Sequence, residues 1–355
     1  MPNITYATVS VLSGYGKKAP AAILLEYGSK RILLDAGGGL QSGDEMGWTF
    51  PQGLDAIIIS HDHVDHARGL EQLDYPVPVY ATAPVLALLP NHLSLHTLPI
   101  KGDVTIEGIP FTVGQAGHSL GGIWIHADIG SGIFYSGDYS LESSLFAFDP
   151  PPPAALALID ASYGLYDEPL AHTKDALLSL LERPEPVLLP VPPTGRALEI
   201  ANWLWEQGRD DWSLGPDCLT PEQALALPHG CLKAEVLASL QAMPYSSYQP
   251  NAHIIISGDP DGLGGEVARL LKEEPDRTVI YTGYLPRKAE LDVSAGKAHS
   301  LRWNVHPRKQ DLKWMVDHLQ CTQCLPLFHP INNIQEWASC IGPSLITQTH
   351  LRIYA

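Results

Sequence analysis

The chain has 355 residues, of which 45% are hydrophobic and 17% charged, and its net charge is −17 at pH 7. This is a globular composition with enough apolar residues for two domains or one large one with an insertion. It contains no run of 18 apolar residues and no basic start followed by an apolar stretch, so we expect neither a membrane span nor a signal peptide. The acidic balance disfavours a non-specific binder of polyanions.

The first 160 residues alternate short apolar runs with Gly, Pro and Asp, a pattern typical of β-strands. We predict strands at 4–12, 21–27, 31–35, 55–60, 77–81, 111–113, 123–129 and 133–136. Helical patterns are sparse here, and the best are 65–73 and 84–89. A proline-rich turn then precedes a further buried strand that ends in Asp160. These elements predict a sheet-dominated layered structure with covering helices.

After residue 166 strands alternate with longer helical patterns, which indicates a parallel α/β unit. The predicted elements are helices 172–183, 195–207, 231–241 and 264–274 and strands 187–191, 252–256 and 278–282. Strands 299–303 and 324–328 and helices 308–319 and 331–340 follow. We therefore predict a discontinuous domain formed by 1–165 and 296–355, with a smaller inserted domain at 166–295.

The five cysteines are scattered and odd in number, which argues against a disulfide framework and suits the cytoplasm. Cys321 and Cys324 form a C-x-x-C without the second pair that a zinc knuckle needs, so we interpret them as ordinary thiols. The stretch from Glu266 to Lys313 holds ten Lys or Arg against seven Asp or Glu, so it is locally basic in an acidic chain.

The segment "IIISHDHVDHARG" at 57–69 carries three histidines and two aspartates in six positions after a buried strand. Loops at the carboxyl end of such a strand commonly present ligand-binding side chains. Neutral imidazole and carboxylate suit Zn²⁺, and without a cation the cluster would concentrate unpaired polar groups at a half-buried edge. The spacing therefore predicts a metal site containing His61, His63, Asp65 and His66.

These residues resemble the metallo-β-lactamase superfamily, in which H-x-H-x-D-H follows a hydrophobic strand. Two further motifs of that superfamily follow in order, "AGHSLGG" and "FYSGDYS". The resemblance implies an αββα sandwich and two zinc ions per chain, with Mn²⁺ as an alternative metal. It also implies the ligands: His61, His63 and His118 for one zinc, Asp65 and His66 for the second, and Asp138 as the bridge.

The rest of the chain is similar to one branch of the superfamily, the β-CASP nucleases. The segments "LALIDASYG", "WNVHPRKQDLKWMVDHL" and "CLPLFHP" place Asp160, His306 and His329 at the three extra motifs of that branch. "VPPTGRALEIANWL", "ISGDPDGLGGEVARLL" and "VIYTGYLPRKAEL" resemble stretches of its inserted domain. By this resemblance His329 completes the second zinc site, and histidine at that motif is typical of RNA-acting members. Asn304, where the branch usually has serine, and "HPRK" after it are departures that bear on phosphate contacts.

The resemblance implies a zinc-dependent phosphodiester hydrolase that acts on single-stranded RNA, with DNA less favoured. Two zinc ions that share a hydroxide provide a nucleophile at neutral pH. The leaving ribose hydroxyl needs a proton, and His306 is the candidate general acid, with Asp160 holding its other ring nitrogen. The expected catalytic residues are Asp65, His306 and Asp160.

Three other functions stay open at this stage. One is a small-substrate hydrolase, of the thioesterase or lactonase type, on the same di-zinc site. The acidic net charge argues mildly for it, and the insert with His306 and His329 argues against it. A single-stranded DNA nuclease is another. The third is a non-catalytic nucleic-acid-binding scaffold, which the complete set of seven expected ligands disfavours. The sequence predicts no membrane partner and leaves a homo-oligomer open.

Overall fold

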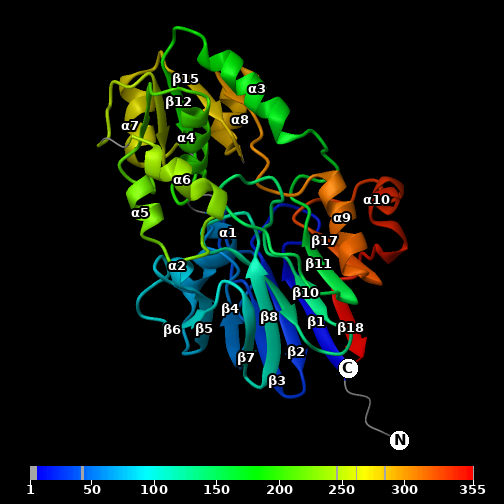
Figure 1. Ribbon diagram of the computed structural model, residues 1–355. Helices are drawn as coiled ribbons and strands as arrows, with labels where there is room; N and C mark the ends of the chain where they lie inside the picture. Colours follow the sequence, from blue (N-terminus) through cyan, green and yellow to red (C-terminus); the bar gives the residue numbers. More distant parts are fainter. Residues whose placement is uncertain (1–5, 41–43, 245–246, 261, 284, 355) are drawn as a thin grey trace, which may run out of the picture. The chain divides into compact units, whose positions relative to one another are not determined.

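The computed structural model describes residues 6–40, 44–244, 247–260, 262–283 and 285–354 (Figure 1). Contacts divide the described chain into two units. The first unit contains the described parts of 1–141, 148–167 and 306–355, and the second contains those of 142–147 and 168–305. The inserted domain predicted at 166–295 therefore lies in the second unit apart from its first two residues, and this unit runs on to residue 305.

The first unit is built on two sheets. The seven-stranded sheet has the order β18–β1–β2–β3–β4–β5–β6. Its strands are β1 (Tyr6–Ser13), β2 (Ala22–Tyr27), β3 (Lys30–Leu34), β4 (Ala56–Ile58), β5 (Pro78–Thr82), β6 (Ser94–Leu98) and β18 (His350–Tyr354). The six-stranded sheet has the order β17–β11–β10–β9–β8–β7. Its strands are β7 (Gly102–Ile106), β8 (Ile109–Gln115), β9 (Ile123–Ala127), β10 (Ile133–Tyr135), β11 (Leu156–Asp160) and β17 (Gln323–Leu327).

Hydrophobic side chains from the inner faces of both sheets form one continuous core, which includes Leu25 and Ile58 of the first sheet and Phe111 and Leu158 of the second. Full burial of each such side chain contributes about 1.5–3 kcal/mol to folding. A second cluster packs the short helices α1 (Val64–Ala67), η1 (Arg68–Gln72) and α2 (Ala83–Leu86) against the outer face of the seven-stranded sheet.

The outer face of the six-stranded sheet is covered by α9 (Lys309–Leu319) and α10 (Ile334–Ile341), with the short turn η2 (Gly342–Ser344) after them. Leu312, Met315 and Trp337 supply the buried contacts of these helices. Because each sheet has one face in the shared core and one under helices, the first unit is an αββα sandwich, and the predicted fold class is confirmed.

The second unit has a five-stranded sheet in the order β13–β14–β12–β15–β16. All its strand pairs are parallel, as predicted. Its strands are β12 (Val187–Pro190), β13 (Trp212–Leu214), β14 (Ile254–Ser257), β15 (Thr278–Tyr281) and β16 (Ala298–Ser300). Its helices are α3 (Leu170–Leu181), α4 (Arg196–Glu206), α5 (Pro221–Leu225), α6 (Ala234–Ala242), α7 (Gly265–Glu273) and α8 (Arg287–Ser294).

Several elements were missed from sequence. β6, β7 and β18 have mostly exposed or half-buried residues, so they lack the apolar runs that predict a strand. β13, α5 and α8 are short. The helix predicted at 65–73 is α1 followed by η1, and residues 4–5 of the first predicted strand lie outside the described residues. None of the helices in the described ranges has the length and hydropathy needed to cross a lipid bilayer.

A buried carboxylate joins distant segments of the second unit. Glu199 in α4 is 3% exposed. Its Oε1 accepts hydrogen bonds from the hydroxyl of Ser143 at 2.8 Å and from the backbone N–H of Ser144 at 2.6 Å. Its Oε2 accepts one from the indole N–H of Trp303 at 3.2 Å. These bonds explain why residues 142–147 and 296–305 belong to this unit.

Replacing Glu199 should therefore destabilise the second unit. We expect Glu199→Ala to lower the free energy of unfolding by about 2–4 kcal/mol, because the buried donors of Ser143, Ser144 and Trp303 lose their acceptor. Urea unfolding followed by tryptophan fluorescence measures the change. Glu182→Ala, at an exposed helix end, is the matched control and should change it by less than about 0.5 kcal/mol. Equal stability of the two variants would contradict this account.

Candidate metal centre

The H-x-H-x-D-H segment lies at the carboxyl end of β4, and its loop is held by backbone hydrogen bonds. The carbonyl of Asp65 accepts from the N–H of Ala21 at 2.7 Å, and the carbonyl of Val64 accepts from the N–H of Gly38 at 2.9 Å. A Cβ at position 37 would lie 1.9 Å from the Asp65 carbonyl oxygen, so Gly37 is needed for this close approach. The loop therefore fixes the backbone from which the side chains of Asp65 and His66 project.

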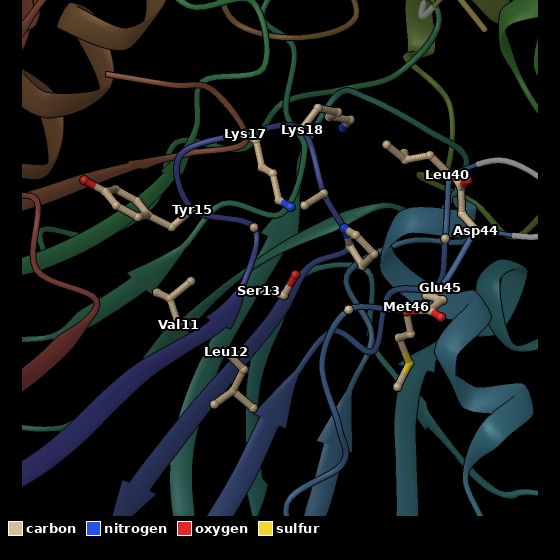
Figure 2. A pocket seen from close by; sticks show the side chains of 15 residues that line it. Val11, Leu12, Ser13, Tyr15, Lys17, Lys18, Leu40, Asp44, Glu45 and Met46 are labelled. Atoms are coloured by element: carbon tan, nitrogen blue, oxygen red, sulfur yellow. The ribbon is translucent and has the colours of Figure 1, made fainter. Parts of the chain in front are cut away.

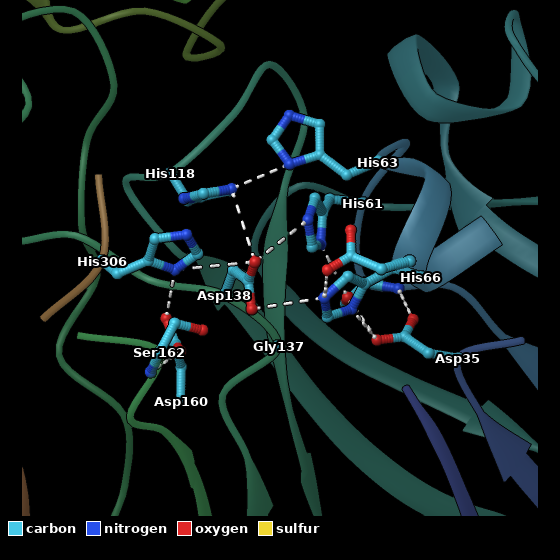
Figure 3. Close-up of polar contacts among 12 residues, drawn as sticks. Asp35, His61, His63, His66, His118, Gly137, Asp138, Asp160, Ser162 and His306 are labelled. Atoms are coloured by element: carbon cyan, nitrogen blue, oxygen red, sulfur yellow. Dashed lines mark hydrogen bonds and ion pairs between the residues drawn. The ribbon is translucent and has the colours of Figure 1, made fainter. Parts of the chain in front are cut away.

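Two other loops complete the centre from the second sheet. His118 lies between β8 and β9, where Gly117 has a φ of +70° and a Cβ there would meet the Ser140 carbonyl oxygen at 2.2 Å. Asp138 follows β10 after Gly137, whose φ is +53°. Both side chains are buried and point toward the histidines of the first loop (Figure 3). The glycines that flank the two motifs in sequence thus allow tight turns that carry the side chains inward.

The side chains form three groups in which one donor atom from each residue lies within 4.8 Å of the others. Asp138 belongs to all three. The groups are His61, His63, His118 and Asp138; Asp65, His66 and Asp138; and Asp138, Asp160 and His306. Oδ2 of Asp138 lies 3.8 Å from Nε2 of His61 and 3.7 Å from Nε2 of His118, and Oδ1 lies 3.2 Å from Nε2 of His66. The Asp138 carboxylate thus lies between the histidines of the first two groups, a position that suits it to bridge two cations.

The chemistry of the donors fits a metal. Nε2 of His61 is buried and has no hydrogen-bond partner among the described residues, which is costly unless a cation satisfies it. Burial lowers the pKa of His61 well below its usual value, and the neighbouring His66 and His63 lower it further. His61 is therefore neutral, the form in which imidazole binds metal.

His66 has the opposite tendency. Burial opposes its protonation, but the carboxylates of Asp138, Asp35 and Asp65 raise its pKa well above the usual value. Burial works against the charged form of Asp138 too, yet Lys18, His66 and His306 hold its pKa well below the usual range. The buried carboxylates, Lys18 and the histidines therefore stabilise one another's charged forms.

In the third group a buried carboxylate orients a histidine. Nδ1 of His306 lies 2.7 Å from Oδ2 of Asp160, and Oδ1 of Asp160 accepts the backbone N–H of Ser162 at 2.8 Å. The ring of Tyr163 packs edge-on against His306 with a centroid distance of 4.9 Å. Asp160 is fully buried, whereas the side chain of His306 is 13% exposed. This arrangement holds the imidazole in one orientation and leaves part of it accessible to solvent.

Residues 30–176 match the family model described as a beta-lactamase superfamily domain. Transcription termination factor FttA of Methanothermobacter thermautotrophicus is 24% identical over an alignment that covers 86% of this chain and 60% of that protein. Ribonuclease TTHA0252 of Thermus thermophilus is 25% identical over 75% of this chain and 77% of that protein. Endoribonuclease YSH1 of Candida glabrata is 24% identical over 62% of this chain and 35% of that protein.

Over residues 30–176 the chain is thus similar to the beta-lactamase superfamily. The relatives align with the chain well beyond the matched domain, and the chain has the inserted parallel unit that its resemblance to the β-CASP branch implies. The chain spans less than two thirds of the length of the termination factor it matches. A crystal structure of an Enterococcus faecalis protein of unknown function shares the fold over 99% of this chain, with a TM-score of 0.63 and 15% identity.

Most of the superfamily residues predicted from sequence come together. His61, His63, Asp65, His66, His118, Asp138, Asp160 and His306 all enter the three donor groups. Within the described residues His329 enters none of them. Its Nδ1 lies 2.9 Å from the carbonyl oxygen of Pro330, and its Nε2 lies 2.6 Å from where a Cβ on Gly164 would stand. Its role as a ligand stays a prediction.

Asp35 is a residue of the centre that sequence reasoning missed. Its Oδ2 lies 2.7 Å from Nδ1 of His66 and accepts the hydroxyls of Ser60 at 2.7 Å and Tyr135 at 2.6 Å. Asp35 directly follows β3, which is the parallel neighbour of β4. Carboxyl ends of adjacent parallel strands share one edge of a sheet, so an aspartate at the end of "RILLD" was the available signal.

Lys18 was missed as well. Its Nζ lies 2.7 Å from Oδ2 of Asp65 and 3.8 Å from Oδ2 of Asp138. It also lines a pocket of about 440 Å³, together with Lys17, Asp44 and Glu45 (Figure 2). Nothing in the sequence distinguishes Lys18 from Lys17, because the loop between β1 and β2 decides which of the two turns inward.

Asp35 should act on the metal through His66. We expect Asp35→Asn to weaken zinc binding by about 10–100-fold, because His66 loses the charged acceptor that orients its ring and raises its basicity. Zinc affinity measured in competition with a chromophoric chelator tests this. Asp55→Asn, which removes an ion pair with Lys30 at the other end of β4, is the control. Unchanged affinity in a folded Asp35→Asn protein would show that Asp35 has only a structural role.

Proposed function

We propose that this chain is a metal-dependent phosphodiester hydrolase that cleaves RNA. One observation carries the proposal: Nδ1 of His306 lies 3.6 Å from the same Asp138 oxygen that lies near His61 and His118. A histidine fixed by a buried carboxylate thus lies beside two groups of metal donors. The names of the ribonuclease and endoribonuclease relatives support RNA as the substrate class.

The finer assignment is two zinc ions per chain, with Mn²⁺ as an alternative. His61, His63 and His118 would hold one ion, Asp65 and His66 the other, and Asp138 would contact both. Bound metal would lower the pKa of water to near neutrality, which would provide a nucleophile, and would stabilise charge that develops on the phosphate oxygens. His329 is proposed as a further ligand of the second ion.

The chain's own proton donor is His306. Its Nδ1–H is donated to Asp160, so Nε2 is the nitrogen from which a proton can pass to the leaving ribose oxygen. Asp160 acts as a positioning residue, because its second oxygen is engaged by the Ser162 N–H and its carboxylate therefore has a fixed orientation. Asp65 would contribute to the catalytic centre as a metal ligand beside His66.

The substrate class is tested with a panel of single-stranded RNA, DNA of matched sequence and a thioester or lactone. We expect cleavage of RNA in preference to DNA. The rate at low substrate concentration should fall as salt rises, because phosphate contacts release counterions. Faster cleavage of DNA would overturn the RNA assignment. Turnover of the thioester or lactone with both nucleic acids intact would identify a small-substrate hydrolase instead.

The role of His306 is tested by changing the leaving group. We expect His306→Ala to lose roughly 10²–10⁴-fold in rate on RNA, where the ribose oxygen needs a proton. The same variant should lose little on bis(p-nitrophenyl) phosphate, whose leaving group is stable as an anion near neutral pH. Asp160→Asn should show the same contrast more weakly, and His92→Ala, at an exposed loop, should show none.

Zinc measured in the same preparations separates the proton donor from a ligand. His306→Ala should retain its zinc, whereas His329→Ala should lose zinc together with activity if His329 is a ligand. Equal loss on both substrates with zinc retained would mean that His306 binds or positions the phosphate. Loss of zinc from His306→Ala would make it a ligand.

A further inference from the structure

The two groups of metal donors differ in what surrounds them. The first group offers three imidazoles and one carboxylate, those of His61, His63, His118 and Asp138. The second offers one imidazole and the carboxylates of Asp65 and Asp138, and Lys18 contacts both of these carboxylates. The ammonium of Lys18 lies 2.7 Å from Oδ2 of Asp65, which is the distance of a direct charge-assisted hydrogen bond.

Lys18 is held at this position from more than one side. Its Nζ lies 5.2 Å from the centroid of the Phe328 ring, within the range of a cation–π contact. Phe328 has a φ of +65° and its ring packs edge-on against His66 at 5.4 Å. The backbone carbonyl of Asp65 accepts the N–H of Ala21, three residues after Lys18. The loop that carries Lys18 is therefore tied to the same turn as the carboxylate that the lysine contacts.

An ammonium and a divalent cation compete when they share carboxylates. Two positive ions that both contact Asp65 would lie within a few ångströms of each other, where their repulsion is strong in a low-dielectric environment. A metal at the second group must therefore displace Lys18 from Asp65. The first group is less affected, since three of its four donors are neutral imidazoles and Lys18 lies 3.8 Å from the remaining carboxylate oxygen.

The displaced side chain has space to move. The pocket of about 440 Å³ adjoins Lys18, and its wall carries the acidic residues Asp44 and Glu45 (Figure 2). The side chain of Lys18 is 24% exposed, so its movement into this pocket does not require the core to open. A lysine that leaves Asp65 thus has space within this pocket.

We propose that the Lys18 ammonium occupies the place of a cation at the second group of donors, so that the two groups bind metal one after the other. The three-histidine group binds metal first, and the second group binds metal only with displacement of Lys18 from Asp65. This inference rests on the proposed function, because it assumes that both groups serve as metal sites. It assigns to Lys18 control over the second metal, a role that neither the sequence motifs nor the ligand set contains.

Zinc binding to the metal-free full chain tests the inference without any substrate. Titration in competition with a chromophoric chelator should resolve two steps in the wild type, a tight one and one at least about tenfold weaker. Lys18→Met removes the charge and keeps the length of the side chain. It should strengthen the second step by about tenfold or more and leave the first within about threefold.

Two variants serve as controls. Lys17→Met removes the neighbouring charge in the same pocket, at an exposed position, and should titrate like the wild type. Lys18→Arg keeps the positive charge and should keep the second step weak, which also guards against a folding defect in Lys18→Met. Circular dichroism of each metal-free variant confirms that it is folded.

Two equal steps in the wild type, or identical titrations of Lys18→Met and Lys17→Met, would overturn the inference. Either result leaves the proposed function intact, because RNA cleavage needs metal at the centre but no order of binding. Conversely, a chain that binds zinc in the expected order and leaves RNA uncut would overturn the proposed function alone.

Discussion

The constraint on which this centre depends is buried negative charge. The carboxylates of Asp35, Asp65, Asp138 and Asp160 are each at most 5% exposed and lie around one group of imidazoles. Removing a carboxylate from water costs several kcal/mol unless a positive partner or hydrogen-bond donors compensate it. The histidines, Lys18 and the proposed metal ions are therefore parts of one charge balance. A change in any of them alters the affinity of the others for protons or metal.

The sandwich explains how residues far apart in the chain meet. β3 and β4 are parallel neighbours, so Asp35 and the loop after β4 lie at one edge of the first sheet. β10, β11 and β17 are parallel neighbours in the second sheet, so Asp138, Asp160 and the segment before His329 follow adjacent strand ends. The positions that close the centre are loops, but the strands beneath them are among the most buried of the molecule. A rigid support of this kind is what a multi-ligand metal site requires.

Sequence was sufficient wherever a strong local pattern existed. The apolar runs predicted the buried strands and the parallel insert, and the motifs predicted eight of the residues that the structure brings into the donor groups. It was insufficient for β6, β7 and β18, because edge strands expose much of their surface and do not need apolar residues. It also missed Asp35 and Lys18, whose importance comes from neighbours that lie 31 and 47 positions away in the chain, His66 and Asp65. Pairings of this kind depend on the tertiary fold and leave no periodic signal.

The place of the last strands in the chain has a consequence for biosynthesis. β17 completes the second sheet beside β11, and β18 pairs with β1 along the edge of the first, but both follow the inserted unit in the chain. A nascent chain that has emerged only as far as residue 305 has a complete second unit, whereas its sandwich still exposes the β1 and β11 edges. Domains generally fold as units during synthesis. The insert can therefore fold before the domain that carries the metal donors is complete, and His306 can meet Asp160 only after the whole insert has been synthesised.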